Sequence, residues 1–292
     1  MAGFRTFGEY VDGLRAGKMR TFGWRKNVIP VTLSGGWLDL SVMPGIPPPQ
    51  FYATTPLNAA TLTGVPGSDG LPIGGSIGGT DKRFVHELLI NTSSANGAAC
   101  PLLMVDLLMY YPFCDQGVAG EQAMVNSVTL PRYTTGEGVQ IMAVLVFPQT
   151  GLGDTFVVSY TNSDGVAGRT TQLVTCNTMT YLGGIMSSAS TGVIAGRFGA
   201  FLPLQAGDSG VRSIESVTMT NGTDVGVFTL VLVRPIGAYN SREFTAPNEY
   251  TCLKDLGYMP EFFDGACLSL LAQPENSLTV VSLYGLLTTS WG

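Results

Sequence analysis

The sequence predicts an all-β protein: a β-sandwich, with a jelly roll as the expected form, preceded by a long extended N-terminal arm that carries one short helix. Three observations predict this class. Residues 156–175 read as a hairpin, about ten strand-like segments with short turns occupy the chain beyond Lys82, and residues 30–80 are rich in proline and glycine. The expected division is an arm over 1–80 and a β-sandwich domain over 81–292.

The clearest local signal is the hairpin FVVSYTNSDGVAGRTTQLVT at 156–175. Phe156, Val158 and Tyr160 fall on one face of a strand, which is the period-2 pattern of a half-buried strand. Residues 162–165 then form a turn, because Asn and Asp accept local backbone hydrogen bonds and Gly165 tolerates the left-handed conformation.

Beyond Lys82 the sequence alternates between strand-like runs and turns, and no convincing helix follows residue 20. The run VGVFTLVLV at 225–233 is apolar on both faces, so we expect it inside the sandwich and not at an edge. Turn formers at 221–222 and 274–277 indicate hairpins. The predicted strands are 83–90, 102–111, 124–130, 138–147, 155–161, 168–176, 211–220, 225–234, 266–273 and 278–289.

One short helix is predicted near 7–16, where apolar residues recur at helical spacing from Phe4 to Leu14. Thr6 and Glu9 form a capping box at its start, and Gly17 is placed to end it. Two internal glycines each cost about 1 kcal/mol. We therefore expect the helix to form only when it is docked on another surface.

Residues 30–80 contain eight prolines and end in GVPGSDGLPIGGSIGG, which favours an extended chain without a core of its own. Aromatic and apolar side chains are threaded through this segment, although a disordered linker has no need of them. We expect an arm that lies in grooves of neighbouring subunits and becomes ordered on assembly. Its expected contact residues are Phe7, Arg20, Trp24, Arg25, Trp37, Phe51 and Tyr52.

Only 12% of the 292 residues are charged, about half the share of an ordinary soluble domain. This low share predicts that other subunits cover much of the surface. Residues 1–26 carry a net charge of +4 and the rest of the chain −10, within a total of −6. The arm is therefore opposite in sign to the body, which indicates either a segment that binds an acidic partner or an arm that is simply solvated.

No apolar run approaches the length of a membrane helix, and the charged N-terminus does not resemble a signal peptide. We expect neither membrane association nor secretion. The five cysteines are odd in number, widely spaced and without a CxxC pair, which favours buried thiols over zinc ligands or disulfides. They are Cys100, Cys114, Cys176, Cys252 and Cys267.

The run GDSG at 207–210 is the feature most suggestive of catalysis, because chymotrypsin-like proteases carry GDSG around their nucleophile. His86, Asp106 and Ser209 also occur in the order of that catalytic triad. The flanking residues differ from that family, however, and His86 lies in the strand pattern FVHELLI. We expect a protein that is not an enzyme, with no catalytic, cofactor-binding or metal-binding residues.

Three other patterns in the sequence fall short of a functional motif. The glycine-rich run at 74–82 lacks the GK[ST] of a phosphate loop, and no pair of carboxylates is singled out for glycoside hydrolysis. Basic and aromatic residues mix at 20–26, but so few cations would bind nucleic acid weakly. Nucleic acid is therefore not an expected partner.

Several segments resemble a group of virion structural proteins of tailed bacteriophages, most of them uncharacterised. The resemblance spans most of the chain and implies a component of a phage particle that is assembled in the host cytoplasm. It brings no catalytic or ligand-binding residues with it. The segments are GEYVDGLRAGKMRTFGWRK, GGWLDLSVMPGIPPPQFYATTPL, MYYPF, VTLPRYTTGEGVQIM, SYTNSDGVAGR, PLQAGDSGVRSIESVTM and FTLVLVRPI.

The resemblance does not identify the component. Major capsid proteins of tailed phages have a long spine helix, and none is predicted here. A β-sandwich with an anchoring arm suits a capsid decoration or cement protein, whose partners would be the major capsid protein and other copies of the chain. A tail, baseplate or fibre-associated component is the alternative. A virion carbohydrate-binding or hydrolase module is a third, and would need exposed rings such as Tyr110, Tyr111, Tyr133 or Trp291.

Overall fold

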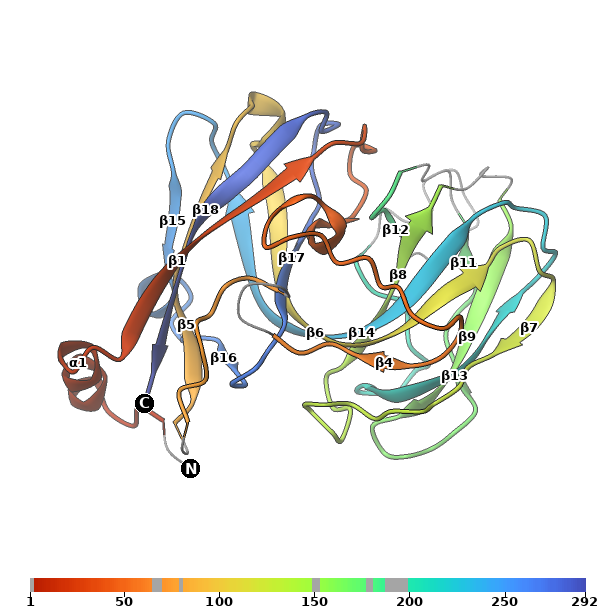
Figure 1. Ribbon diagram of the computed structural model, residues 1–292, viewed down its shortest axis with the longest axis horizontal. Helices are drawn as coiled ribbons and strands as arrows, with labels where there is room; N and C mark the ends of the chain where they lie inside the picture. Colours follow the sequence, from red (N-terminus) through yellow and green to blue (C-terminus); the bar gives the residue numbers. More distant parts are fainter. Residues whose placement is uncertain (1–2, 65–69, 79–80, 149–152, 177–180, 187–198) are drawn as a thin grey trace.

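The computed structural model describes residues 3–64, 70–78, 81–148, 153–176, 181–186 and 199–292, and it confirms the all-β prediction (Figure 1). Strands dominate, and the helices are short. The elements in chain order are α1 (Phe7–Arg15), β1 (Met19–Val28), β2 (Leu38–Asp39), β3 (Gly45–Ile46), β4 (Ala60–Thr61), β5 (Arg83–Thr92), β6 (Cys100–Asp115), β7 (Gly120–Ala123), β8 (Gln140–Phe147), β9 (Thr155–Asn162), β10 (Arg169–Thr170), β11 (Val174–Thr175), β12 (Ile185–Met186), β13 (Val211–Met219), β14 (Val227–Ser241), β15 (Asn248–Thr251), α2 (Cys252–Asp255), β16 (Glu261–Phe262), β17 (Leu268–Ala272) and β18 (Val281–Trp291), with 3-10 turns at Leu40–Val42 and Ala95–Gly97.

The strands form three antiparallel sheets. Sheet A has the order β15-β5-β18-β1-β3, with β16 also paired to β5. Sheet B has the order β12-β8-β14-β6-β17-β2, with β4 also paired to β6. Sheet C has the order β10-β9-β13-β7, with β11 also paired to β9.

Sheet B is shared by two lobes because β6 and β14 are long enough to run through both. They pair antiparallel from Cys100 opposite Ser241 to Asp115 opposite Val227. β17 flanks β6 at residues 102–106, whereas β8 flanks β14 at residues 227–233. Sheet A packs on the half that includes β17, and we call this the terminal lobe (Figure 1). Sheet C packs on the half that includes β8, and we call this the distal lobe.

One continuous hydrophobic cluster fills both lobes. In the distal lobe the ring of Phe156 on β9 lies 5.0 Å from that of Phe228 on β14. The hydroxyl of Tyr111 on β6 accepts a hydrogen bond from the backbone N–H of Ile214 on β13. The apolar run at 225–233 was predicted inside the sandwich, and β14 does lie between β8 and β6 with its core residues fully buried.

Most predicted strands are present, with three differences. The segment 124–130 is not a strand, because the sheet C pairing ends with β7 at Ala123. The segment 168–176 is divided into β10 and β11, which pair with opposite ends of β9. The four-residue helix α2 was not predicted. The turn at 162–165 is confirmed: Asn162 Oδ1 accepts hydrogen bonds from the N–H groups of Asp164 and Val166, and Gly165 has a φ of 80°.

Helix α1 confirms the predicted helix, including its cap. The Thr6 hydroxyl accepts a hydrogen bond from the N–H of Glu9, as the capping box requires. The helix packs against sheet A: the Tyr10 hydroxyl lies 2.9 Å from Nδ1 of His86, and the ring of Phe4 lies 5.6 Å from that of Phe84. Its docking surface is therefore strand β5 of the same chain.

The prediction that residues 1–80 form an arm separate from the β domain is wrong in its central part. All ten residues of β1 pair with β18, so the segment is an interior strand of sheet A. Alternation explains why: Trp24, Lys26 and Val28 are buried while Gly23 and Arg25 are exposed. This period-2 pattern at 19–28 is the signature of a strand that is missing from the predicted set.

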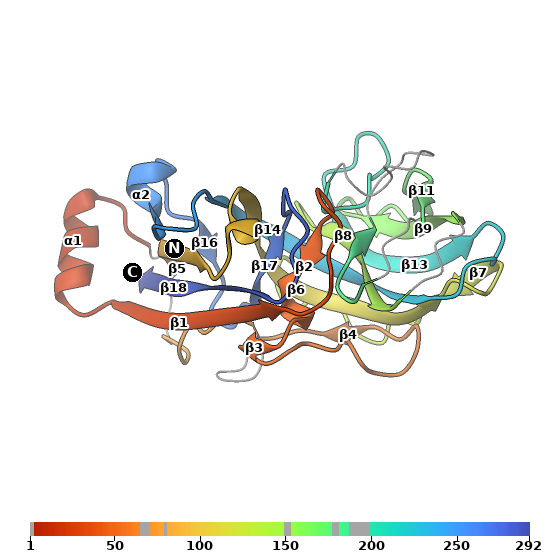
Figure 2. The same ribbon diagram turned by 90° about the horizontal axis from the view of Figure 1, so that it is seen from above.

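The remainder of the expected arm lies along sheet B, where β2 pairs with β17 and β4 with β6 (Figure 2). Polar contacts hold it there. The buried Lys26 ammonium donates hydrogen bonds to three backbone carbonyls of residues 41–47. The buried Asp39 carboxylate accepts one of 2.6 Å from the Tyr52 hydroxyl. Residues 65–69 and 79–80 of the predicted Pro/Gly linker lie outside the described residues.

This packing predicts opposite effects of truncating two aromatic residues that were both expected to anchor the arm. Trp24 is 2% exposed, so Trp24→Ala should lower the free energy of unfolding by about 3–5 kcal/mol through the cavity that it leaves. Phe51 is 63% exposed, so Phe51→Ala should change it by less than about 0.5 kcal/mol. Urea denaturation of the purified variants measures both. Equal effects would contradict the packing of the first 62 residues on their own chain.

Candidate functional site

The protease-like residues are not brought together. His86 lies on β5 of sheet A and its Nδ1 contacts Tyr10. Asp106 lies on β6 and is bound by Arg132. Ser209 lies just before β13 of sheet C, where its hydroxyl is 2.9 Å from that of Ser163. Three residues with separate partners on three different sheets cannot form a triad.

The GDSG run is instead a structural turn, and Asp208 is its centre. This carboxylate accepts hydrogen bonds from the Tyr160 hydroxyl (2.6 Å), the Asn162 amide (2.8 Å) and the Arg169 guanidinium (3.0 Å). The hydrogen bond from Arg169 is the main cause that lowers the pKa of Asp208 to about 2. The network ties the β9–β10 hairpin to the segment before β13.

The glycine-rich run at 74–82 does not offer a phosphate site in its described part. The Asp264 carboxylate accepts hydrogen bonds from the Ile77 N–H and the Ser76 hydroxyl, so a protein anion already occupies the donors of this loop. Arg83 binds the same carboxylate at 2.7 Å. Residues 79–80 of the run lie outside the described residues.

The surface best suited to a partner is the outward side of sheet A. We use the name sheet A face for the residues on the outward side of sheet A that α1 does not cover. Cross-strand pairs set its rows: Gly23 lies opposite Leu286, and Leu286 opposite Leu89. In the adjacent row, Arg25 lies between Tyr284 and the partly paired β3. The members are Thr21, Gly23, Arg25, Ile46, Leu89, Asn91, Tyr284 and Leu286.

Large apolar side chains remain uncovered on and around this face. Ile46 is 61% exposed, Leu286 43% and Tyr284 40%. At the end of the β1–β18 ribbon, where Val28 pairs with Val281, the neighbouring Ile29 and Val280 are 60% and 79% exposed. Tyrosine, arginine and aliphatic side chains without lysine are the composition of a protein interface core.

The outward side of sheet C provides a contrast within the same molecule. There the Glu215 carboxylate accepts hydrogen bonds from the hydroxyls of Ser159 (3.1 Å) and Thr161 (2.7 Å). The hydroxyls of Thr155 and Thr220 lie 2.7 Å apart. Hydroxyls paired with a carboxylate form a surface that is stable in water, so the outward side of sheet C is polar at these positions, where the sheet A face is apolar.

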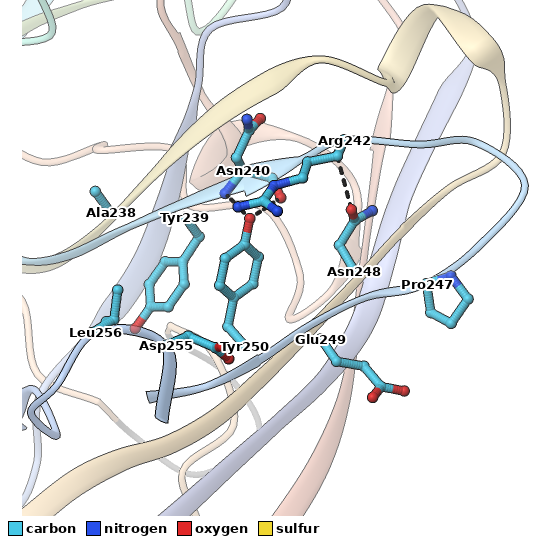
Figure 3. Close-up of a pocket in the computed structure, with 10 residues that line it drawn as sticks. All are labelled: Ala238, Tyr239, Asn240, Arg242, Pro247, Asn248, Glu249, Tyr250, Asp255 and Leu256. Carbon is cyan, nitrogen blue, oxygen red and sulfur yellow. Dashed lines mark hydrogen bonds between the residues drawn. The ribbon is translucent and has the colours of Figure 1, made fainter. Parts of the chain in front are cut away.

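A pocket of about 570 Å³ adjoins the sheet A face between the end of β14, β15 and α2 (Figure 3). Glu249 joins the two surfaces, because it lines the pocket and pairs with Leu89 of the face. The Arg242 guanidinium lies 5.8 Å from the ring of Tyr250, whose hydroxyl donates to the Asn240 carbonyl. Within the described part of the chain this guanidinium has no hydrogen bond or ion pair, which leaves its donors available to a partner.

The seven predicted anchor residues divide into two groups. Trp24, Trp37 and Tyr52 are buried in their own chain, at 2%, 7% and 0% exposure, so the expectation that they bind a neighbour's groove is wrong for this structure. The other four lie at the surface of the terminal lobe or on the segment that runs along sheet B. These are Phe7, Arg20, Arg25 and Phe51.

Sequence reasoning missed the residues that complete the sheet A face, namely Tyr284, Leu286 and Leu89. They belong to strands that were predicted correctly, and period-2 alternation on 281–291 marks which side they share. The sequence does not show which strands are neighbours. Only the β1–β18 pairing shows that Arg25 and Tyr284 lie side by side.

The cysteines and acidic residues of the described ranges provide no further candidate site. All five cysteines are buried thiols, and burial raises the pKa of Cys252 to about 11. No cluster of three or more His, Cys, Asp or Glu suitable for a metal ion occurs among the described residues. No helix in the described part of the chain has the length and apolar character needed to cross a membrane.

Comparison with known proteins gives little further information. No protein-family model matches the sequence, and no curated protein is similar to it. Among solved structures, a mutant VP2 protein of infectious bursal disease virus, solved as derived T=1 particles, aligns with 93% of this chain and 77% of its own. The identity is 9% and the TM-score 0.20, so this similarity carries no argument.

The Asp208 network makes a pH-dependent prediction. The ordinary pKa of the carboxyl group is 3.8 and that in the folded chain is about 2. Because the folded pKa is depressed, the contribution of Asp208 to stability is present above about pH 4 and is lost as the pH falls through about 2. The difference in the free energy of unfolding between the wild type and Asp208→Asn should therefore shrink between pH 5 and pH 2, measured by urea denaturation. A constant difference would contradict the assigned network.

Proposed function

We propose that this chain is a non-enzymatic structural protein of a tailed-bacteriophage particle, which attaches to the capsid shell as a decoration or cement protein through the terminal lobe. Its partners are the major capsid protein and neighbouring copies of the chain. The resemblance of the sequence to phage virion proteins supports the particle assignment. The observation that supports the attachment surface is the contrast between the apolar, arginine-bearing sheet A face and the hydroxyl-rich outward side of sheet C.

The charge distribution supports an acidic partner for this surface. Arg25 is exposed on the sheet A face, and Arg242 lies in the adjoining pocket. The chain as a whole has a net charge of −6. An acidic patch on the shell would complement these arginines, and so would the acidic body of a neighbouring copy.

Counting copies in purified particles tests the location. A decoration protein that follows the shell lattice is present in hundreds of copies, whereas a tail, baseplate or fibre component follows the tail symmetry with about six or twelve copies or small multiples of these. Quantitative mass spectrometry relative to the major capsid protein measures the ratio. A ratio that corresponds to tail symmetry would replace the decoration assignment with the tail alternative.

Gly23 allows the attachment surface to be tested without disturbing the fold. A Cβ atom at this position meets nothing within 4 Å, and the residue lies beside Leu286 in the middle of the sheet A face. Gly23→Glu should therefore fold normally, but it should weaken binding to particles that lack the protein by at least about tenfold, or about 1.4 kcal/mol. Cosedimentation of purified protein with such particles measures the binding.

The matched control is Ala123→Glu, which adds the same side chain to an exposed position on β7 of sheet C. This variant should bind particles like the wild type. A second control is Gly285→Ala, which should fail to fold well, because its Cβ would lie 1.8 Å from the Leu89 carbonyl oxygen. Equal binding by the wild type and Gly23→Glu would exclude the sheet A face as the attachment surface.

A further inference from the structure

A second pocket, on a different part of the molecule, is lined by aromatic side chains. Its cavity volume is about 260 Å³, and we call it the aromatic pocket. Three segments distant in sequence build it: the loop between β7 and β8, the middle of β14, and the chain around β16. Its principal residues are Tyr133, Arg234, Tyr258, Pro260, Glu261 and Phe263.

Two rings of this pocket are exposed, and one of them, Phe263, is held in place by Tyr133. Tyr258 is 54% exposed and Phe263 49%. Phe263 packs edge-to-face on Tyr133, with ring centroids 4.8 Å apart at 86°. Tyr133 has a φ of 50°, a conformation that is unusual for a bulky residue and that clusters at binding sites. Aromatic rings fixed in this way provide flat apolar surfaces open to a ligand.

Polar groups surround these rings. The Arg234 guanidinium lies 5.4 Å from the centroid of the Tyr133 ring and also donates a hydrogen bond to the Glu137 carbonyl, so its plane is fixed. The Glu261 carboxylate is exposed and is paired with Lys82 at 2.7 Å. In the described part of the chain, the hydroxyls of Tyr133 and Tyr258 have no hydrogen-bond partner. Burial raises the pKa of Tyr133, so its hydroxyl remains a donor at neutral pH.

We propose that the aromatic pocket binds carbohydrate, with one pyranose ring stacked on the exposed rings of Tyr258 and Phe263. The C–H groups on one side of a pyranose are apolar and complement an aromatic face, while its ring of hydroxyls requires planar groups that donate and accept in pairs. Arg234 supplies paired donors and Glu261 paired acceptors at the margin of the pocket. Arg234 keeps guanidinium N–H groups beyond the one that it gives to the Glu137 carbonyl, so the margin of the pocket remains polar.

The size of the pocket favours a sugar over a longer segment of protein. A volume of 260 Å³ lies below the range of sites for larger ligands, and a single sugar ring with its first neighbour suits it. The proposal is independent of attachment to a particle, because none of its residues belongs to the sheet A face. It adds a glycan-binding activity to a protein for which we propose a structural role.

Saturation-transfer NMR on the full-length protein tests the proposal. The probes are the methyl glycosides of glucose, galactose, N-acetylglucosamine and rhamnose, followed by a glycan array for longer chains. At least one glycan should bind saturably, with a Kd of about 1 mM, as expected for a one-ring ligand in a small open pocket. A saturation-transfer signal from a proline-rich peptide, with no such signal from any glycan, would overturn the proposal.

Variants locate the binding. Tyr258→Ala and Phe263→Ala should each weaken it by at least tenfold, whereas Tyr258→Phe should retain most of it because the ring face remains. The matched control is Tyr284→Ala, a similarly exposed tyrosine on the sheet A face, which should bind like the wild type. Unchanged binding in both alanine variants would overturn the proposal. Gly23→Glu should not affect glycan binding, so failure of this proposal and failure of particle attachment are distinguishable.

Discussion

The buried ion pair between Asp106 and Arg132 fixes the place where the two lobes meet. The Asp106 side chain is fully buried on β6, and Arg132 binds both of its oxygens at 2.8 and 2.7 Å. Arg132 also donates to the carbonyls of Leu62 and Leu107, and Asp106 accepts from the N–H of Cys267. A buried carboxylate without partners costs several kcal/mol. Three segments must therefore converge here: the N-terminal segment at Leu62, the loop between β7 and β8, and the start of β17.

The same pair positions a surface feature. Arg132 directly precedes Tyr133, so the turn that carries the Tyr133 ring begins at an immobilised guanidinium. Arg234, opposite Asp106 on β14, meets that ring from the other side. The aromatic pocket is thus built next to the buried ion pair of sheet B, although its rings lie at the surface. A binding site with ordered walls loses little conformational freedom when a ligand enters.

The sequence predicted the features that depend on residues close together in the chain. It did not predict those that depend on strand pairing between distant segments. The all-β class, the cap of α1 and the turn at 162–165 follow from residues adjacent in sequence, and all three are confirmed. Strand β1 was interpreted as a free arm, because its partner β18 lies about 260 residues further along the chain. Trp24 and Tyr52 were read as anchors for the same reason. An aromatic side chain in an extended segment has the same local signature whether its groove belongs to its own chain or to a neighbour.

The shared strands also determine how the molecule would carry mechanical load. β6 runs from the terminal lobe into the distal lobe, and β14 returns in the opposite direction. A force that pulls the lobes apart is therefore resisted by two covalent backbones and not by a noncovalent interface. Separation requires unravelling of the strands themselves, and yielding should start where their ladder is irregular, such as between Leu232 and Val233 or between Pro235 and Gly237. Such a molecule transmits tension between whatever surfaces its two ends contact.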